Sequence, residues 1–211
     1  MKQIYKNEFF TIFTDTENLN NQQKIFDALN DNLARIMSFF EVEKLSKAIS
    51  VCIHSDLEEW KNFITNRGTP YQDYVVGCAW EGKIDVLAFE EYQKTQMHKD
   101  DSFDDFLKVV IHEFVHICHQ EIQPDFSKVT WFIGEGLATY LADQRYNEEE
   151  EIDFPKETLF DFRQFMNLHS PYCAAQKLVR ALVKKVTHKE LLEYARDAEK
   201  LYMDWEKIWG R

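Results

Sequence analysis

The segment between Ser102 and Gln120 constrains the fold of this 211-residue chain more than any other. Ser102 followed by Asp105 is a capping-box pattern, which satisfies the free N–H groups of a first helical turn. After it, apolar residues recur at three- and four-residue steps, which places them on one helix face. Pro124 prevents the helix from continuing much further. The pattern predicts a helix from Ser102 to about Gln120, with the apolar residues Phe106, Leu107, Val110, Ile111, Phe114 and Val115.

Two histidines and a glutamate lie inside this predicted helix, in the run His112-Glu113-Phe114-Val115-His116. Residues four apart project from one helix face, so His112 and His116 can bind one ion. Neutral imidazole is a good zinc ligand, and zinc with three protein ligands keeps a fourth position for water. Glu113 would stand beside the metal and act as general base. The alternative is a chance match, because H-E-x-x-H has three fixed positions and occurs in many unrelated chains.

A third ligand candidate, Glu135, follows His116 after eighteen residues and lies in a helix predicted over residues 131–146. The whole pattern, with Gly136, Ala138 and Tyr140 behind Glu135, resembles the gluzincin metallopeptidases, above all their aminopeptidase-type and peptidase MA-like branches. The resemblance covers about residues 45 to 185, most specifically at the two motifs.

This resemblance implies an α+β, zincin-like fold. A small twisted N-terminal sheet would place an edge strand over the cleft, with the active-site helix beneath it, and a helical C-terminal lobe would carry Glu135. The resemblance also implies one zinc ion per chain, held by His112, His116 and Glu135, and hydrolysis of a peptide amide bond.

A competing zinc-protease pattern, that of the metzincins, has a glycine three residues after the second histidine and a third histidine three residues later. Here those positions hold His119 and Ile122. His119 also lies about 4.5 Å further along the helix axis than His116. The metzincin interpretation therefore fails, and we expect His119 to be a core residue or to support a ligand.

The rest of the chain fits the same element order. Residues 9–14, 48–54, 75–80 and 84–89 read as strands, and helices are expected over residues 25–40 and 56–63. Further helices begin at Pro171 after Ser170 and at the capping box of Thr187 and Glu190. The acidic run 148–151 reads as a solvated loop. We predict one domain, 1–211, with a lobe of sheet and active-site helix over 1–121 and a helical lobe over 122–211.

The resemblance also suggests roles for several further residues. Gluzincins often stabilise the oxyanion with a tyrosine or histidine downstream of the third ligand, which suggests Tyr172 here, with His169 in reserve; Tyr172 as a packing residue is the alternative. Thr139 stands where some gluzincins have an aspartate that orients a ligand histidine. The run from Gly77 to Glu81 is similar to the motif that grips a substrate amino terminus, but an extra residue and a missing asparagine argue against that role.

Composition limits the partners. A net charge of −12 disfavours nucleic acid and anionic membranes, and the expected partner is a peptide or protein substrate. The four cysteines have no metal-knuckle or redox spacing and are expected to be free thiols. No signal-peptide pattern or membrane-spanning stretch is present, so we predict a cytoplasmic protein of undetermined oligomeric state. Other functions fitting the sequence are an inactive zincin-fold binding module with structural zinc and, third, a metal-free helical protein.

Overall fold

The computed structural model describes residues 1–15, 21–68, 71–144 and 155–210. The chain divides into two compact units, Met1–Ile117 and Cys118–Arg211. The boundary falls inside α4 (Phe103–Ile122), the helix predicted from Ser102 to about Gln120. The described elements make this an α+β protein, as predicted.

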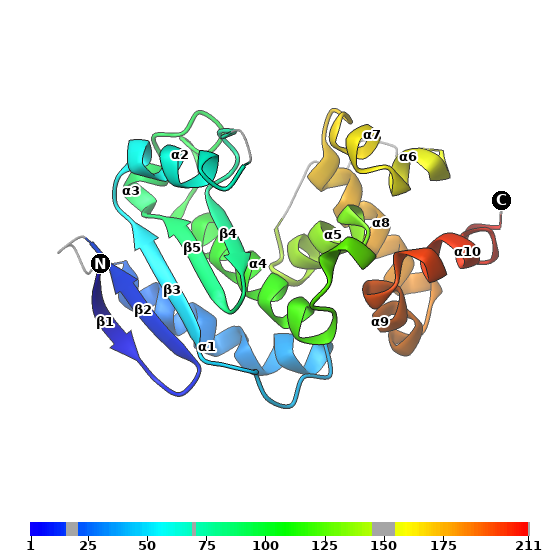
Figure 1. The fold of residues 1–211 in the computed structure, drawn as a ribbon, viewed down its shortest axis with the longest axis horizontal. Coiled ribbons are helices and arrows are strands. Elements are labelled where there is room, and N and C mark those ends of the chain that lie inside the picture. The colour runs from blue at the N-terminus through cyan, green and yellow to red at the C-terminus, as the bar shows by residue number, and fades with distance from the viewer. Residues whose placement is uncertain (16–20, 69–70, 145–154, 211) are drawn as a thin grey trace. The chain divides into compact units, whose positions relative to one another are not determined.

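The first unit is built on a mixed five-stranded sheet among its described residues (Figure 1). The strand order is β1-β2-β3-β5-β4, in which β2, β3 and β5 are parallel and both edge strands, β1 and β4, are antiparallel to their neighbours. The strands are β1 (Lys2–Lys6), β2 (Phe10–Thr14), β3 (Ile49–His54), β4 (Gly77–Trp80) and β5 (Lys83–Leu87). All four predicted strands are confirmed, whereas β1 was not predicted.

One face of the sheet is apolar and packs in the core. Ile12, Val51 and Ile84 are fully buried, and the Phe10 ring meets the Phe114 ring of α4 edge to face at 5.4 Å. Alternate residues point to opposite sides of a strand, so the other face carries a different set of side chains. The helices of this unit besides α4 are α1 (Gln22–Phe39), α2 (Leu57–Thr65) and α3 (Phe89–Tyr92).

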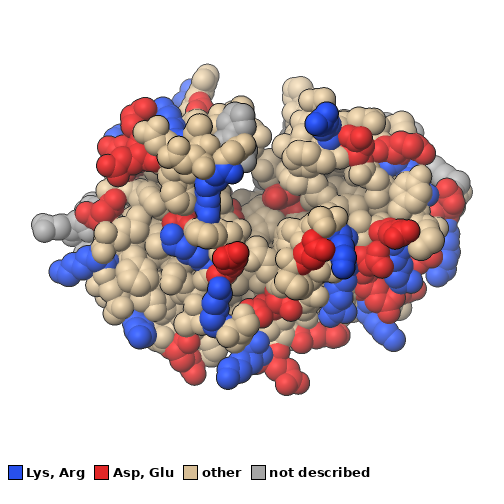
Figure 2. All heavy atoms as spheres, in the orientation of Figure 1, with Lys and Arg blue, Asp and Glu red and all other residues tan. Residues whose placement is uncertain are grey.

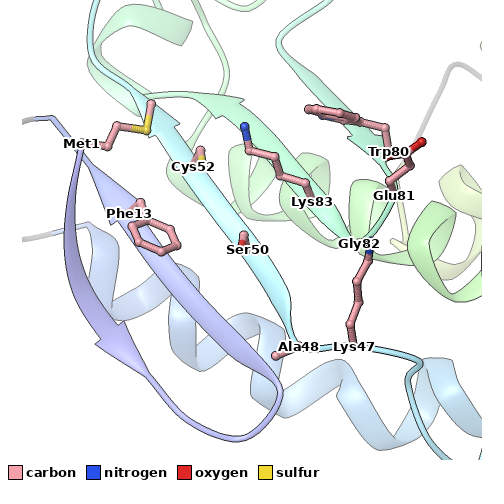
Figure 3. A pocket seen from close by; sticks show the side chains of 10 residues that line it. All are labelled: Met1, Phe13, Lys47, Ala48, Ser50, Cys52, Trp80, Glu81, Gly82 and Lys83. Carbon is pink, nitrogen blue, oxygen red and sulfur yellow. The ribbon is translucent and has the colours of Figure 1, made fainter.

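The other face of the sheet bears a cavity of about 450 Å³. Figure 3 shows Phe13, Ser50, Cys52 and Lys83 of three neighbouring strands on its floor, with α1 and α4 behind the sheet. Strands β4 and β5 are joined at one end of this cavity by Glu81 and Gly82, with φ angles of 47° and 73°. Two consecutive positive φ values are typical of a tight hairpin turn, and β4 pairs antiparallel with β5.

The second unit is helical in its described part. It contains the end of α4, the 3₁₀ turn η1 (Phe126–Lys128) and the helices α5 (Trp131–Leu141), α6 (Lys156–Phe160), α7 (Phe162–Met166), α8 (Pro171–Lys185), α9 (His188–Arg196) and α10 (Ala198–Trp209). The predicted helix starts at Pro171 and after Thr187 are confirmed, and Thr187 and Glu190 form the expected capping box. None of the described helices combines the length and apolar character needed to cross a bilayer.

The helix predicted over residues 131–146 is five residues shorter than expected. α5 ends at Leu141, and Asp143 adopts a left-handed φ of 51°, which interrupts the helix. The buried Gln176 side chain donates hydrogen bonds to the backbone oxygens of Thr139 and Gln144 and so secures this early end. Position 146 and the acidic run 148–151 lie outside the described residues.

Candidate metal centre

α4 brings its two histidines together as predicted. The Nε2 atoms of His112 and His116 lie 3.0 Å apart, and His112 is 7% exposed. Two ligands about 2.1 Å from a tetrahedral zinc lie roughly 3.4 Å from each other. The histidine pair therefore has nearly the separation that one ion requires.

The local sequence explains why α4 is regular here. Ser102 Oγ accepts a hydrogen bond from the Asp105 amide, and the Asp105 carboxylate accepts one from the Ser102 amide, which is the predicted capping box. The side-chain hydrogen bond from Ser102, followed by that from Lys108, lowers the pKa of the Asp105 carboxyl. Apolar residues then hold the helix on the sheet, so the two histidines four residues apart share a face.

Glu113 is 93% buried in the first unit and lies against the edge strand β4. A Cβ atom built on Gly77 would lie 2.8 Å from Glu113 Oε1 and 3.0 Å from its Cγ. The carboxylate therefore occupies the space where any other residue at position 77 would place its side chain. Nothing in the sequence pairs these two residues, because the contact depends on the packing of β4 against α4.

The half-buried Glu135 belongs to α5. Its carboxylate and the two imidazoles form a group that could hold a metal ion, since one ligand atom from each of His112, His116 and Glu135 lies within 4.8 Å of the others. The donor set of two imidazoles and one carboxylate suits zinc and leaves a coordination position open for water.

His119 does not belong to this group. It is fully buried, and its Nε2 lies 2.7 Å from the backbone oxygen of Ala195, near the end of α9. Gln123 Nε2 donates in the same way to the Arg196 oxygen at 2.6 Å. Both side chains satisfy carbonyls that have no partner within the last turn of a helix. His119 is therefore a core residue, which is one of the two roles predicted for it.

Tyr172 lies at the head of α8, where it was predicted, and its ring meets the Trp131 ring edge to face at 5.0 Å. This contact agrees with the packing alternative and leaves the hydroxyl's role as a prediction. The reserve candidate His169 is exposed beside Ser170.

The Thr139 hydroxyl donates a hydrogen bond to the backbone oxygen of Glu135 in its own helix. Glu81 is exposed in the hairpin turn, outside strand β4.

A buried carboxylate on β5 was not anticipated from the sequence. Asp85 is fully buried and accepts hydrogen bonds from His54 Nε2 at 2.8 Å and Trp80 Nε1 at 2.9 Å, with Lys83 Nζ at 3.3 Å. Burial alone would raise the pKa of Asp85, but the hydrogen bonds from His54 and Trp80 and the charge of Lys83 lower it below its ordinary value. The sequence did contain a signal for this buried carboxylate, because Asp85 is a charged residue inside the apolar run of β5.

The four cysteines are free, as predicted, and three of them are buried. Burial raises the pKa of the Cys78 thiol to about 12, and the negative charges of Glu113 and Asp85 add to the effect. Burial also raises the pKa of Cys118, which is fully buried. At neutral pH these thiols stay protonated, so their geometry and chemistry give no support to thiolate catalysis.

No protein-family model matches the sequence, and no curated protein matches it either.

Proposed function

We propose that this protein is a zinc-dependent metallopeptidase of the gluzincin type with a zincin-like fold, in which His112, His116 and Glu135 hold one zinc ion. The observation that carries the proposal is the grouping of these three side chains, whose ligand atoms lie within 4.8 Å of one another. The pattern His112-Glu113-x-x-His116 with Glu135 eighteen residues later supports the same set from the sequence alone.

The chain's own residues would carry the proton transfers. When bound, zinc supplies a Lewis acid that polarises the substrate carbonyl and lowers the pKa of water towards about 7. Glu113 takes a proton from the attacking water and passes it to the leaving amine. The burial of Glu113 keeps this carboxylate in one position, and the Tyr172 hydroxyl donates a hydrogen bond to the developing oxyanion.

The edge strand β4 is the element best suited to bind an extended peptide. Within the described residues it pairs with β5 on one side, and a strand edge can bind a peptide through its backbone groups. Gly77 at its start contacts Glu113, so a peptide paired with β4 would pass close to the general base.

The charge of the chain favours a basic or neutral substrate. Asp and Glu number 37 against 25 Lys and Arg, and Figure 2 shows acidic and basic side chains interspersed on the face it presents. The proposal also places the protein in the cytoplasm, where free cysteines stay reduced.

The test compares metal content and hydrolysis in the wild type and three variants. Protein purified without added zinc should carry about one zinc per chain, Glu135→Ala should lose most of it, and Glu113→Gln should retain it. With a quenched-fluorescent peptide library, Glu113→Gln should lower kcat by about 10²- to 10⁴-fold. Glu58→Gln, which changes an exposed glutamate on α2, is the matched control and should change neither quantity.

Two outcomes would contradict the proposal. A wild type that binds no zinc even when zinc is supplied would leave a helix that carries the motif by chance. Zinc retained by the wild type without hydrolysis of any library peptide would favour the inactive zincin-fold module with structural zinc.

A further inference from the structure

The absence of a side chain at Gly77 is not explained by strand geometry. Gly77 does not adopt a positive φ, the conformation for which glycine is usually required, and its neighbours in β4 carry ordinary side chains. What distinguishes the position is the buried Glu113 carboxylate. A Cβ at residue 77 would lie 2.8 Å from its Oε1, 3.0 Å from its Cγ and 3.2 Å from its Cδ. Contacts this short force one of the two partners to move.

The strand cannot readily move. The Val76 carbonyl accepts a hydrogen bond from the Leu87 amide at 3.0 Å, and the Val75 carbonyl accepts one from Trp60 Nε1 at 2.7 Å. At the other end of β4, Trp80 Nε1 donates to the buried Asp85 carboxylate. These bonds fix β4 before and after Gly77, and breaking any of them would leave a buried polar group without its partner.

The helix cannot readily move either. Phe114, the residue after Glu113, is fully buried and its ring packs on Phe10 of β2. Val110 and Val115 are also fully buried. Moving this part of α4 would open a cavity in the core of the first unit. The group that can yield is the flexible Glu113 side chain, whose Oε1, Cγ and Cδ are the atoms nearest to position 77.

We propose that Gly77 is a positioning residue for Glu113: the empty space at its Cα holds the carboxylate in the place where it acts as general base. The inference rests on the proposed function, which supplies the reason for the placement. A methyl group at position 77 would displace the carboxylate while leaving the strand, the helix and the ligand set of His112, His116 and Glu135 intact.

The first test is Gly77→Ala in the zinc-loaded full chain. We expect kcat to fall at least tenfold with KM little changed, because the carboxylate is displaced and the strand edge is not. Zinc content should stay near one per chain. Glu58→Gln, at an exposed position on α2, is the control and should leave kcat unchanged. An unchanged kcat in Gly77→Ala, in a protein that hydrolyses peptides, would overturn the inference and leave the proposed function standing.

The second test needs no activity. Thermal unfolding midpoints are measured for the wild type, Gly77→Ala, Glu113→Ala and the double variant. In the Glu113→Ala background, the methyl group added by Gly77→Ala fills the space that the carboxylate has left. The double variant should therefore have a higher midpoint than Glu113→Ala, whereas Gly77→Ala alone should not have a higher midpoint than the wild type. Equal effects in the two backgrounds would overturn the inference. Unequal effects in a protein that binds no zinc would support the placement of Glu113 by Gly77 and contradict the peptidase function.

Discussion

At the scale of single residues, the buried Asp85 carboxylate joins three strands, because it lies on β5 and accepts hydrogen bonds from His54 of β3 and Trp80 of β4. Asp85→Asn removes the charge that these donors stabilise, and we expect it to lower the free energy of unfolding by about 1–3 kcal/mol at neutral pH. Chemical denaturation measures this difference. Asp31→Asn, at an exposed position on α1, is the control.

The pH dependence of the same variant follows from the sign of the pKa shift. The pKa of Asp85 in the folded chain lies below the ordinary value of 3.8. Its contribution to stability is therefore complete above the ordinary pKa and is lost as the pH falls through the folded pKa. The difference between wild type and Asp85→Asn should shrink as the pH falls below 3.8. A difference that grows towards acid pH would contradict the assignment.

The Tyr172 hydroxyl can be tested apart from its ring. Tyr172→Phe keeps the edge-to-face packing on Trp131 and removes only the hydrogen-bond donor. If the hydroxyl stabilises the oxyanion, kcat should fall by about 10²- to 10³-fold while zinc content and the unfolding midpoint stay unchanged. A kcat equal to that of the wild type would leave Tyr172 as a packing residue.

Residue by residue, the sequence was informative where one helix carries the candidate metal-site residues. His112, Glu113 and His116 lie within one turn of α4, so their spacing alone predicted that the two imidazoles meet. The contact between Gly77 and Glu113 and the hydrogen bond from His54 to Asp85 join residues more than thirty positions apart. Such pairs depend on strand order and register, which a single sequence does not specify.

At the scale of elements, α5 and α8 approach each other closely at Gly136. A Cβ at this position would lie 2.5 Å from both the Ala175 backbone oxygen and Val179 Cγ2, and a backbone atom cannot swing aside. Gly136→Ala should therefore lower the free energy of unfolding by about 1–3 kcal/mol.

Gly134→Ala is the matched control in the same helix. A Cβ at Gly134 would meet only Val129 Cγ1, at 3.9 Å, so the substitution should stabilise the helix by up to about 1 kcal/mol. Denaturant titrations of the two variants give opposite signs if the close approach is real. Two stabilised variants would show that α5 and α8 are farther apart than described.

Element types were predicted better than their ends. Strong periodicity identified α1 and α4, and β-branched runs identified β2 and β3. Strand β1 was missed because it has no buried residue and exposes most of its side chains, so it lacks the apolar alternation of a half-buried strand. The end of α5 was placed too late because its apolar pattern continues beyond Leu141, whereas the left-handed Asp143 and the buried Gln176 that stop it act through backbone geometry and tertiary contact.

At the scale of the whole molecule, zinc binding should be linked to folding. The proposed ligands lie on two different helices, α4 and α5, and an unfolded chain does not hold them together. A ligand that binds only the folded chain, and not the unfolded chain, adds about 2.7 kcal/mol to the free energy of unfolding when its concentration is 100 times its Kd. Zinc should therefore raise the unfolding midpoint of metal-free protein, and a chelator should reverse the shift.

Variants distinguish zinc binding at the proposed site from unspecific binding of metal ions to the acidic side chains, of which the chain has 37. His112→Ala should abolish the zinc-dependent shift, because one of the three proposed ligands is lost, whereas Glu113→Gln should retain it, because Glu113 is not one of the proposed ligands. Magnesium should give no comparable shift in the wild type, since imidazole ligands suit zinc and oxygen ligands suit magnesium. If zinc and magnesium shift the midpoint equally, and do so in His112→Ala as well, the ions are bound by the acidic surface. The histidines of α4 would then be side chains of a metal-free helix.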